Sequence, residues 1–207
     1  VAKLVPGGQM RLKGALYTPS DGRAKPQKAP PAIARAAQSL GATLLTGCAA
    51  RGVETSAGRV AAVVTEKGRI ACDAVVLAGG AWSRLFCGNL GVALPQLKVR
   101  SSVMRTEKLD GGPELGMLGH GYGVRKRLDG GYTIANLDAS VAEIVPDSFR
   151  LMFDFLPILR LEWNSIKIRI GERFLAEWRT PRRWPLDQPS PFEAVRVLDP
   201  APVASAN

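Results

Sequence analysis

The chain has 207 residues, of which 46% are hydrophobic and 22% charged, a globular balance that excludes a disordered protein. The length corresponds to one large domain or two small ones. Basic residues exceed acidic ones by 28 to 18, for a formal net charge of +10, and no apolar stretch reaches the ~18 residues needed to span a membrane. The first residues lack the pattern of a signal peptide, so we expect a cytoplasmic protein without a membrane span.

The positive charge is spread thinly along the chain. Residues 1–100 hold 14 basic and 4 acidic side chains, whereas residues 101–207 hold 14 of each. A nucleic-acid interface usually concentrates basic charge on one face. We therefore expect no nucleic-acid partner, although a basic binding module stays open as an alternative.

Three cysteines and one histidine limit the possible chemistry. Cys48, Cys72 and Cys87 are too few and too scattered for a disulfide framework, and they predict buried, reduced thiols. His120 alone cannot form a zinc site that needs two histidines, so no metal site is predicted. A structural role is favoured for His120 over that of a catalytic base.

The first half of the chain predicts a layered α/β arrangement. The expected elements, in order, are a helix over 31–40, a short strand over 43–46, a hairpin over 60–65 and 69–72, a strand over 73–78 and a helix over 84–90. The strand over 73–78 is apolar at consecutive positions, which is typical of parallel strands buried on both faces.

The segment that follows this strand carries the clearest functional signal. Gly79-Gly80 allows the backbone to approach a flat ligand closely, and Ser83 is expected to cap a helix whose first amide groups favour a negative ligand group. Trp82 can cover a ring system. A plain strand-to-helix turn with a tryptophan in the core explains the same residues, so both interpretations stay open at this point.

The second half predicts an antiparallel α+β domain. Strands are expected over 97–105, 121–127, 132–136 and 166–170, a helix over 149–161 that breaks at Pro157, and an irregular connection over 181–191. Asp129-Gly130-Gly131 is a strong hairpin turn. The sequence contains neither a Gly-x-Gly-x-x-Gly motif nor a Walker A motif.

Several short stretches, taken in their order and spacing, resemble the D-amino-acid oxidase-like family of FAD-dependent oxidoreductases (the glycine oxidase, sarcosine oxidase and D-amino-acid dehydrogenase type). The resemblance lies in residues 14–22 with Pro26, 40–42, 58–60, 64–68, 75–83 and 127–134. The run Val75–Ser83, which reads Val-Val-Leu-Ala-Gly-Gly-Ala-Trp-Ser, is the clearest of these matches.

The resemblance implies an α/β plus α+β fold. Within it, residues 1–20 end a substrate-domain segment, 21–95 form a partial FAD-binding α/β layer, 96–197 form an antiparallel-sheet substrate domain and 198–207 form a tail. The family's pyrophosphate-binding motif and its closing C-terminal segment have no counterpart here. We therefore expect a central fragment, whose apolar surfaces favour a partner chain or self-association.

The resemblance also implies the chemistry. FAD would accept a hydride from the carbon bearing an amine, and the resulting imine would hydrolyse to a keto acid and ammonia. The implied FAD contacts are Ala50, Ala78, Gly79, Gly80 and Trp82. A structural subunit without catalysis of its own is the alternative to this enzyme.

A carboxylate substrate needs an arginine anchor with a tyrosine hydroxyl beside it. The candidates on the predicted strands are Arg105, Arg125, Arg127, Tyr122 and Tyr132. Among them we select Tyr122 and Arg125 as the predicted catalytic residues.

Overall fold

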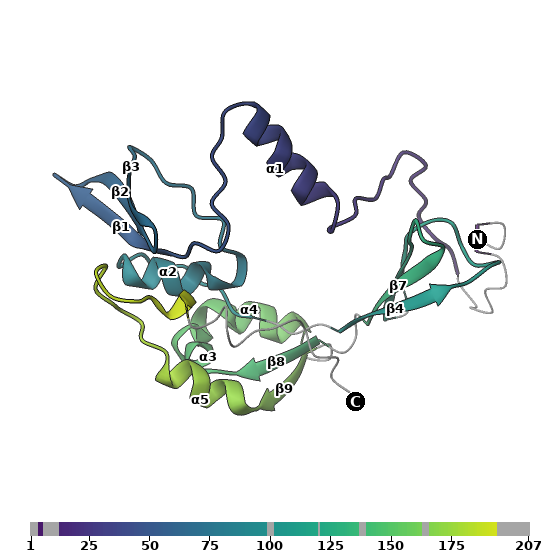
Figure 1. The fold of residues 1–207 in the computed structure, drawn as a ribbon. Coiled ribbons are helices and arrows are strands. Elements are labelled where there is room, and N and C mark those ends of the chain that lie inside the picture. Colours follow the sequence, from purple (N-terminus) through teal and green to yellow (C-terminus); the bar gives the residue numbers. More distant parts are fainter. Residues whose placement is uncertain are drawn as a thin grey trace. The chain divides into compact units, whose positions relative to one another are not determined.

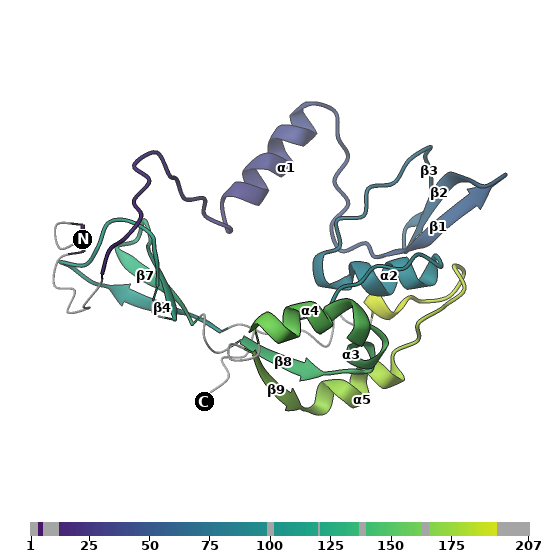
Figure 2. The same ribbon diagram turned by 180° about the vertical axis from the view of Figure 1, so that it is seen from behind.

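The structure is a computed structural model, and it describes residues 4–5, 13–98, 102–119, 121–136, 140–162 and 166–193. The chain forms two compact units, each assembled from two segments. The first unit combines residues 1–45 with 101–139, and the second combines 46–100 with 140–207. Figures 1 and 2 show the elements from opposite sides. The predicted domain boundaries near residues 20, 95 and 197 stay a prediction.

The first unit contains a four-stranded antiparallel sheet with the order β4-β7-β6-β5. Its strands are β4 (Val103–Lys108), β5 (Met117–Gly119), β6 (Tyr122–Lys126) and β7 (Gly131–Asn136). The predicted strands over 121–127 and 132–136 are confirmed, and Gly130 supplies the positive φ of +85° in the turn between them. The strand predicted over 97–105 begins only at Val103, and the three residues of β5 were too few for a sequence pattern to reveal.

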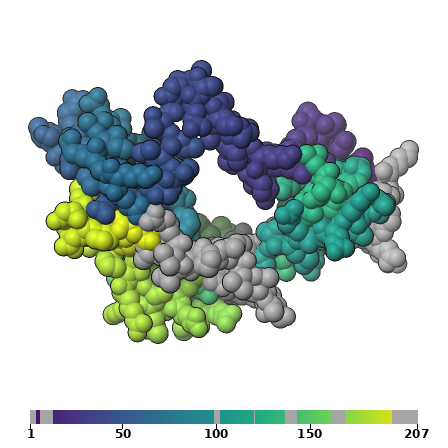
Figure 3. All heavy atoms as spheres, viewed as in Figure 1, coloured from purple at the N-terminus to yellow at the C-terminus, as the bar shows by residue number. Residues whose placement is uncertain are grey.

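Helix α1 (Ala29–Ser39) also belongs to the first unit and confirms the predicted helix. Prolines occupy its first turn, where the missing N–H has no intrahelical partner to lose. No residue of α1 is buried, and its atoms are among the dark blue spheres of Figure 3. The strand predicted over 43–46 is wrong, because no described strand pairs with this stretch.

The second unit contains a three-stranded antiparallel sheet with β2 in the centre. Its strands are β1 (Ala50–Ser56), β2 (Arg59–Thr65) and β3 (Gly68–Ala71). The hairpin of β2 and β3 is confirmed. β1 escaped prediction because charged residues interrupt its apolar pattern, yet it joins β2 through Ala57-Gly58, whose φ values of +50° and +77° suit a two-residue hairpin turn.

The buried parallel strand predicted over 73–78 is wrong. Residues 74–79 form no regular structure, and Val76 is 91% exposed. A parallel strand needs a neighbouring strand whose amide and carbonyl groups complete its ladder. None of the described strands pairs with this run. The predicted partner chain or self-association, which would cover such a surface, stays a prediction.

The rest of the second unit forms a strand-helix-strand arrangement (Figure 1). Its elements are β8 (Ser140–Ile144), α3 (Pro146–Arg150), α4 (Met152–Glu162), β9 (Ile166–Ile170) and α5 (Glu172–Arg179). The strand β9 is confirmed, but it pairs with β8 in parallel, so the second half of the chain is not purely antiparallel. The helical crossover of α3 and α4 makes this parallel pairing possible.

The helix break predicted at Pro157 is wrong. The interruption falls at Leu151, between α3 and α4, and α4 continues through Pro157. A proline inside a helix removes one backbone hydrogen bond and favours a kink, but it does not by itself end the helix. Residues 181–190 contain no helix or strand, as predicted.

Aromatic rings connect the sheet of the second unit to α2 (Ser83–Asn89) and to residues 181–190, called the irregular segment below. The ring of Phe192 lies 5.6 Å from that of Trp184 in an edge-on arrangement and 6.0 Å from that of Phe86. Trp184 Nε1 donates a hydrogen bond to the carbonyl of Arg51 at 2.6 Å. These contacts place the end of the described chain against β1 and α2.

The fold class is confirmed as a mixture of helices with antiparallel and parallel strands. The three cysteines are free and half-buried, less deeply than predicted. Among the described residues, no helix is long and apolar enough to cross a bilayer.

Candidate functional site

The turn that carries four of the five predicted FAD contacts lies in the second unit. A short 3-10 helix, η1 (Gly80–Trp82), follows the exposed run and leads directly into α2. Trp82 N–H donates to the Gly79 carbonyl at 3.1 Å, and Gln96 Nε2 donates to the Gly80 carbonyl at 3.1 Å. The turn is thus held from within and from one neighbouring segment.

The two glycines of this turn have different roles. Gly80 has a φ of +54°, and a Cβ built on it would meet nothing within 4 Å. A Cβ on Gly79 would lie 3.2 Å from Ser83 Oγ, so Gly79 serves local packing. With Ala78 exposed and the Trp82 side chain 41% exposed, the open face of the turn fits contact with a flat ring system.

The same turn does not fit the pyrophosphate of FAD. Helix α2 has only seven residues, and its N-cap is Trp82, without a side-chain hydrogen bond. Ser83, predicted to be the cap, is buried inside the helix. The predicted negative-group site at this helix start therefore has no support, and the residues present fit only a flat part of FAD.

Ala50, the fifth predicted FAD contact, lies on a strand and not in this turn. It is the first residue of β1, it is half-buried, and it pairs with Thr65 of β2. Among the described residues, no hydrogen bond joins Ala50 to residues 78–82. Its role as an FAD contact stays a prediction.

Tyr122 and Arg125 both lie on β6 in the first unit, on opposite faces of the sheet. Strand β6 pairs with β7 without a bulge from Tyr122 to Lys126. Because side chains alternate between faces along a strand, positions three apart point to opposite sides. The two predicted catalytic residues therefore do not face one ligand from one side of β6, and each stays a separate prediction.

Arg125 shares its face of the sheet with Arg105. Thr133 of β7 pairs with Arg125 on one side and with Arg105 of β4 on the other, so the three form a row across the strands. Arg125 Nη1 donates to the Ala24 carbonyl at 3.0 Å, and Arg105 lies 3.4 Å from Asp129. The alternation of side chains along a strand is the sequence signal that could place Arg105 and Arg125 on one face of the sheet.

Arg127 and Tyr132, the other candidates, are structural. Arg127 donates to the carbonyls of Tyr132 and Thr106 at 2.6 and 2.9 Å and pairs with Asp129 at 3.0 Å. Tyr132 is buried, and a Cβ on Gly112 would overlap its hydroxyl. His120 lies outside the described residues. Among the residues that are described, no group of three potential ligands is placed to hold a metal ion.

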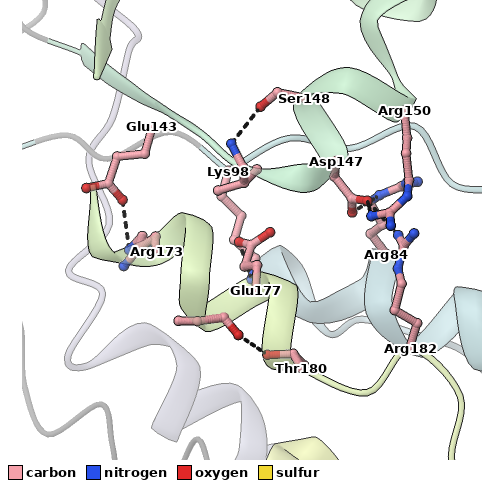
Figure 4. A network of polar contacts seen from close by, with 12 residues as sticks. Arg84, Lys98, Glu143, Asp147, Ser148, Arg150, Arg173, Glu177, Thr180 and Arg182 are labelled. Atoms are coloured by element: carbon pink, nitrogen blue, oxygen red, sulfur yellow. Dashed lines mark hydrogen bonds and ion pairs between the residues drawn. The ribbon is translucent and has the colours of Figure 1, made fainter. Parts of the chain in front are cut away.

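A charged cluster in the second unit was not predicted from the sequence. Figure 4 shows three arginines from different segments that converge on Asp147 at the start of α3. Arg84 Nε and Arg182 Nη2 each lie 2.5 Å from the carboxylate of Asp147, and Arg150 Nη1 lies 3.2 Å away. Only tertiary folding brings residues 84, 147 and 182 together, so no local motif could have revealed the cluster.

The environment shifts two carboxyl groups in this region. Burial alone would raise the pKa of Asp147. The hydrogen bond and charge of Arg84, the charge of Arg182 and the hydrogen bond from Arg150 outweigh this and hold the pKa below its ordinary value. Burial raises the pKa of Glu177 above its ordinary value, and Lys98, 3.9 Å away, offsets this only in part. The pKa values of the two carboxyl groups are therefore shifted in opposite directions.

Both carboxyl groups line one cavity of about 120 Å³. The wall also includes Ala81 and Trp82 of the turn described above, together with Gln96. Gln96 Oε1 is buried without a hydrogen-bond partner among the described residues. The cavity thus combines a surplus of cationic side chains with an unused acceptor.

The chain is similar in sequence and in structure to several known proteins. The chain is 33% identical over 146 residues to 4-methylaminobutanoate oxidase (formaldehyde-forming) of Paenarthrobacter nicotinovorans, which covers 67% of this chain and 18% of that protein. It is 40% identical over 90 residues to D-amino acid dehydrogenase of Sinorhizobium medicae, covering 44% of this chain and 22% of that protein. The structure matches L-amino acid deaminase from Proteus myxofaciens with a TM-score of 0.75 and 41% identity.

The match to the deaminase covers 81% of this chain and 37% of the other. The chain thus spans well under half the length of each of these relatives. A family model described as FAD dependent oxidoreductase matches residues 1–163, which confirms the resemblance predicted from the sequence. The chain belongs to this family of FAD-dependent oxidoreductases.

Proposed function

We propose that the chain takes part in the FAD-dependent oxidation of an amine or an amino acid. The observation that carries this proposal is the family match over residues 1–163, supported by relatives named as an amine oxidase, an amino acid dehydrogenase and an amino acid deaminase. When bound, FAD supplies a two-electron acceptor for the hydride that leaves the carbon bearing the amine.

The part of the chain proposed to contact FAD is the turn over residues 78–82. Gly80 keeps the face of the turn open, because its missing side chain leaves free space there. Trp82 is 41% exposed and offers part of its indole surface, on which a ring system can pack. Ala78 and Gly79 complete the turn, and Ala50 is proposed as a further contact from β1.

Arg125 is proposed to bind a substrate carboxylate. It uses Nη1 on the carbonyl of Ala24, and its Nε and Nη2 have no partner among the described residues. These two groups form the edge of the guanidinium that binds carboxylates through two parallel hydrogen bonds. Arg105, in the same row, adds positive charge, whereas Tyr122 is proposed as a polar contact on the opposite face of β6.

The proposal for FAD is tested by titrating the purified chain with FAD and following the visible absorption and flavin fluorescence. We expect saturable binding that weakens about fivefold in Trp82→Leu, since one aromatic contact contributes roughly 1 kcal/mol. Trp178→Leu is the matched control, because Trp178 is an exposed tryptophan of α5 in the same unit. Equal weakening in both variants, or no binding at all, contradicts the proposed contact.

The proposal for the substrate is tested on the FAD-loaded chain. Amino acids of both configurations and secondary amines are added without oxygen, and loss of the oxidised flavin band identifies a substrate. For a carboxylate substrate, Arg125→Gln is expected to raise the concentration needed for half-maximal bleaching about 30-fold, the loss of a charged hydrogen bond worth ~2 kcal/mol. Arg35→Gln, an exposed arginine of α1, is the control. An unchanged requirement in Arg125→Gln argues against this anchor.

A further inference from the structure

The carboxylate of Asp147 receives more positive charge than it balances. Arg84 on α2, Arg150 at the end of α3 and Arg182 in the irregular segment all contact it (Figure 4). Three cations on one anion leave a surplus of two positive charges, and like charges held this close repel each other. The neighbouring pair of Lys98 and Glu177 is neutral overall and does not reduce this surplus.

The arginines have hydrogen-bond donors left over. Arg84 uses Nε on Asp147 and Nη1 on the Leu94 carbonyl, at 2.5 and 2.7 Å, so its Nη2 has no partner among the described residues. Among the described residues, Arg150 and Arg182 each donate one hydrogen bond, in both cases to Asp147 Oδ1. An arginine carries five N–H donors in a rigid fork, and such forks match the oxygens of carboxylates and phosphates.

These three arginines line the cavity of about 120 Å³ described above. A single water needs only ~10–15 Å³ measured in this way, so the cavity has room for a small polyatomic ion. Gln96, which lines the same cavity, has a buried Oε1 without a partner in the described chain and requires a donor. A ligand that carries one hydroxyl group together with several anionic oxygens satisfies both requirements.

We infer that this cavity binds a small dianionic oxyanion of the phosphate class through the free guanidinium edges of Arg84, Arg150 and Arg182. Hydrogen phosphate carries two negative charges, which equal the surplus on the cluster, and one hydroxyl, which suits Gln96 Oε1. A monocarboxylate offers half of that charge and no donor. This inference goes beyond the proposed oxidation and does not depend on it, because the ligand requires no flavin.

The inference is tested by calorimetric titration of the full chain with inorganic phosphate near pH 7.5, with chloride holding the ionic strength constant. We expect saturable binding at one site. Arg182→Gln is expected to weaken it at least tenfold, since a charged hydrogen bond contributes ~1.5 kcal/mol or more. Arg179→Gln removes an exposed arginine three residues away that does not line the cavity and is expected to leave the affinity unchanged.

Arg150→Gln gives a second comparison, because it leaves the closer pair of Arg84 and Asp147 intact. Circular dichroism shows which variants are folded. Three results would overturn the inference. They are the absence of saturable phosphate binding in the folded chain, equal weakening in Arg179→Gln and in the cavity variants, and acetate binding as tightly as phosphate. The titration is run without FAD, so its result is independent of the flavin experiment.

Discussion

Residues 59–65 and residues 73–78 of the second unit are similar in composition but differ in structure. Both are short, apolar and rich in valine. The first forms β2, the central strand of its sheet, in which Ala62 is fully buried. The second forms no strand, and its valines are exposed. An apolar run favours a strand, but hydrogen-bond partners decide whether the strand forms.

The source of those partners explains the difference. β2 is joined to β1 and to β3 by two-residue connections, so both neighbours come from adjacent sequence. Residues 73–78 follow β3, which is an edge strand, and lead into η1 and α2. A run without adjacent strands depends on pairing with a distant part of a polypeptide, which a local pattern does not reveal.

The largest expected contrast is in amide hydrogen exchange. Because β2 is bonded on both sides, we expect the amides of residues 60–64 to exchange only through unfolding of the sheet, with protection that approaches the global stability of the unit. The amides of residues 75–78 are expected to exchange at nearly the rate of an unstructured peptide. Comparable protection in the two stretches, measured by mass spectrometry or NMR, would remove the distinction between them.

Paired aspartate substitutions test the same contrast through stability. Ala62→Asp buries a carboxylate in the centre of the sheet and is expected to lower the free energy of unfolding by about 4 kcal/mol or more. Val76→Asp places the same group on an exposed side chain and is expected to change it by less than ~0.5 kcal/mol. Urea unfolding measures both. A large loss in Val76→Asp would show that the run is covered in solution.

The far end of the exposed run is fixed by α2, whose Arg84 pairs with Asp147. Asp147→Asn is expected to lower the free energy of unfolding by about 2 kcal/mol near pH 7, because it leaves three guanidinium groups without their carboxylate. In this variant we still expect the amide hydrogens of residues 60–64 to exchange only through global unfolding. Loss of protection throughout β2, before global unfolding, would mean that this cluster also supports the sheet.

The lowered pKa of Asp147 also predicts a dependence on pH. A carboxyl group whose pKa is lower in the folded state stabilises the fold fully above the unfolded value of ~3.9, and this contribution is lost as the pH falls through the folded value. The pKa of Glu177 is higher in the folded state, so its contribution to stability has the opposite sign. Ionised Glu177 destabilises the fold at higher pH, and this penalty disappears as the pH falls toward the ordinary pKa of a glutamate side chain. Asp147→Asn is expected to flatten the acid limb of a stability profile, and an unaltered limb would exclude Asp147 as its origin.

A smaller predicted loss of stability concerns the turn that joins β2 to β3. Gly68 has a φ of +115°, so Gly68→Ala is expected to cost about 1 kcal/mol through backbone strain. Gly14→Ala is the control, because a Cβ there meets nothing within 4 Å and its φ is not positive. Thermal unfolding compares the two variants. Equal stability would show that the turn relaxes without loss of the hairpin.

Local signals explain the parts of the fold and site that could be predicted. The hairpin of β6 and β7 was predictable because Asp129-Gly130-Gly131 specifies a turn, and α1 because prolines mark its start. The family was recognisable from the order and spacing of several short stretches along the chain. The parallel pairing of β8 with β9 and the opposite orientations of Tyr122 and Arg125 required knowledge of strand register.

The sequence by itself determined the elements whose hydrogen bonds and turns are local, and it determined membership of a family of FAD-dependent oxidoreductases. Only the tertiary structure decided that the run over 73–78 has no described partner strand, that Arg127 holds a hairpin together, and that three arginines meet at Asp147. The reason is physical. Side-chain pattern sets a preference for secondary structure, whereas burial and charge depend on which distant residues come into contact.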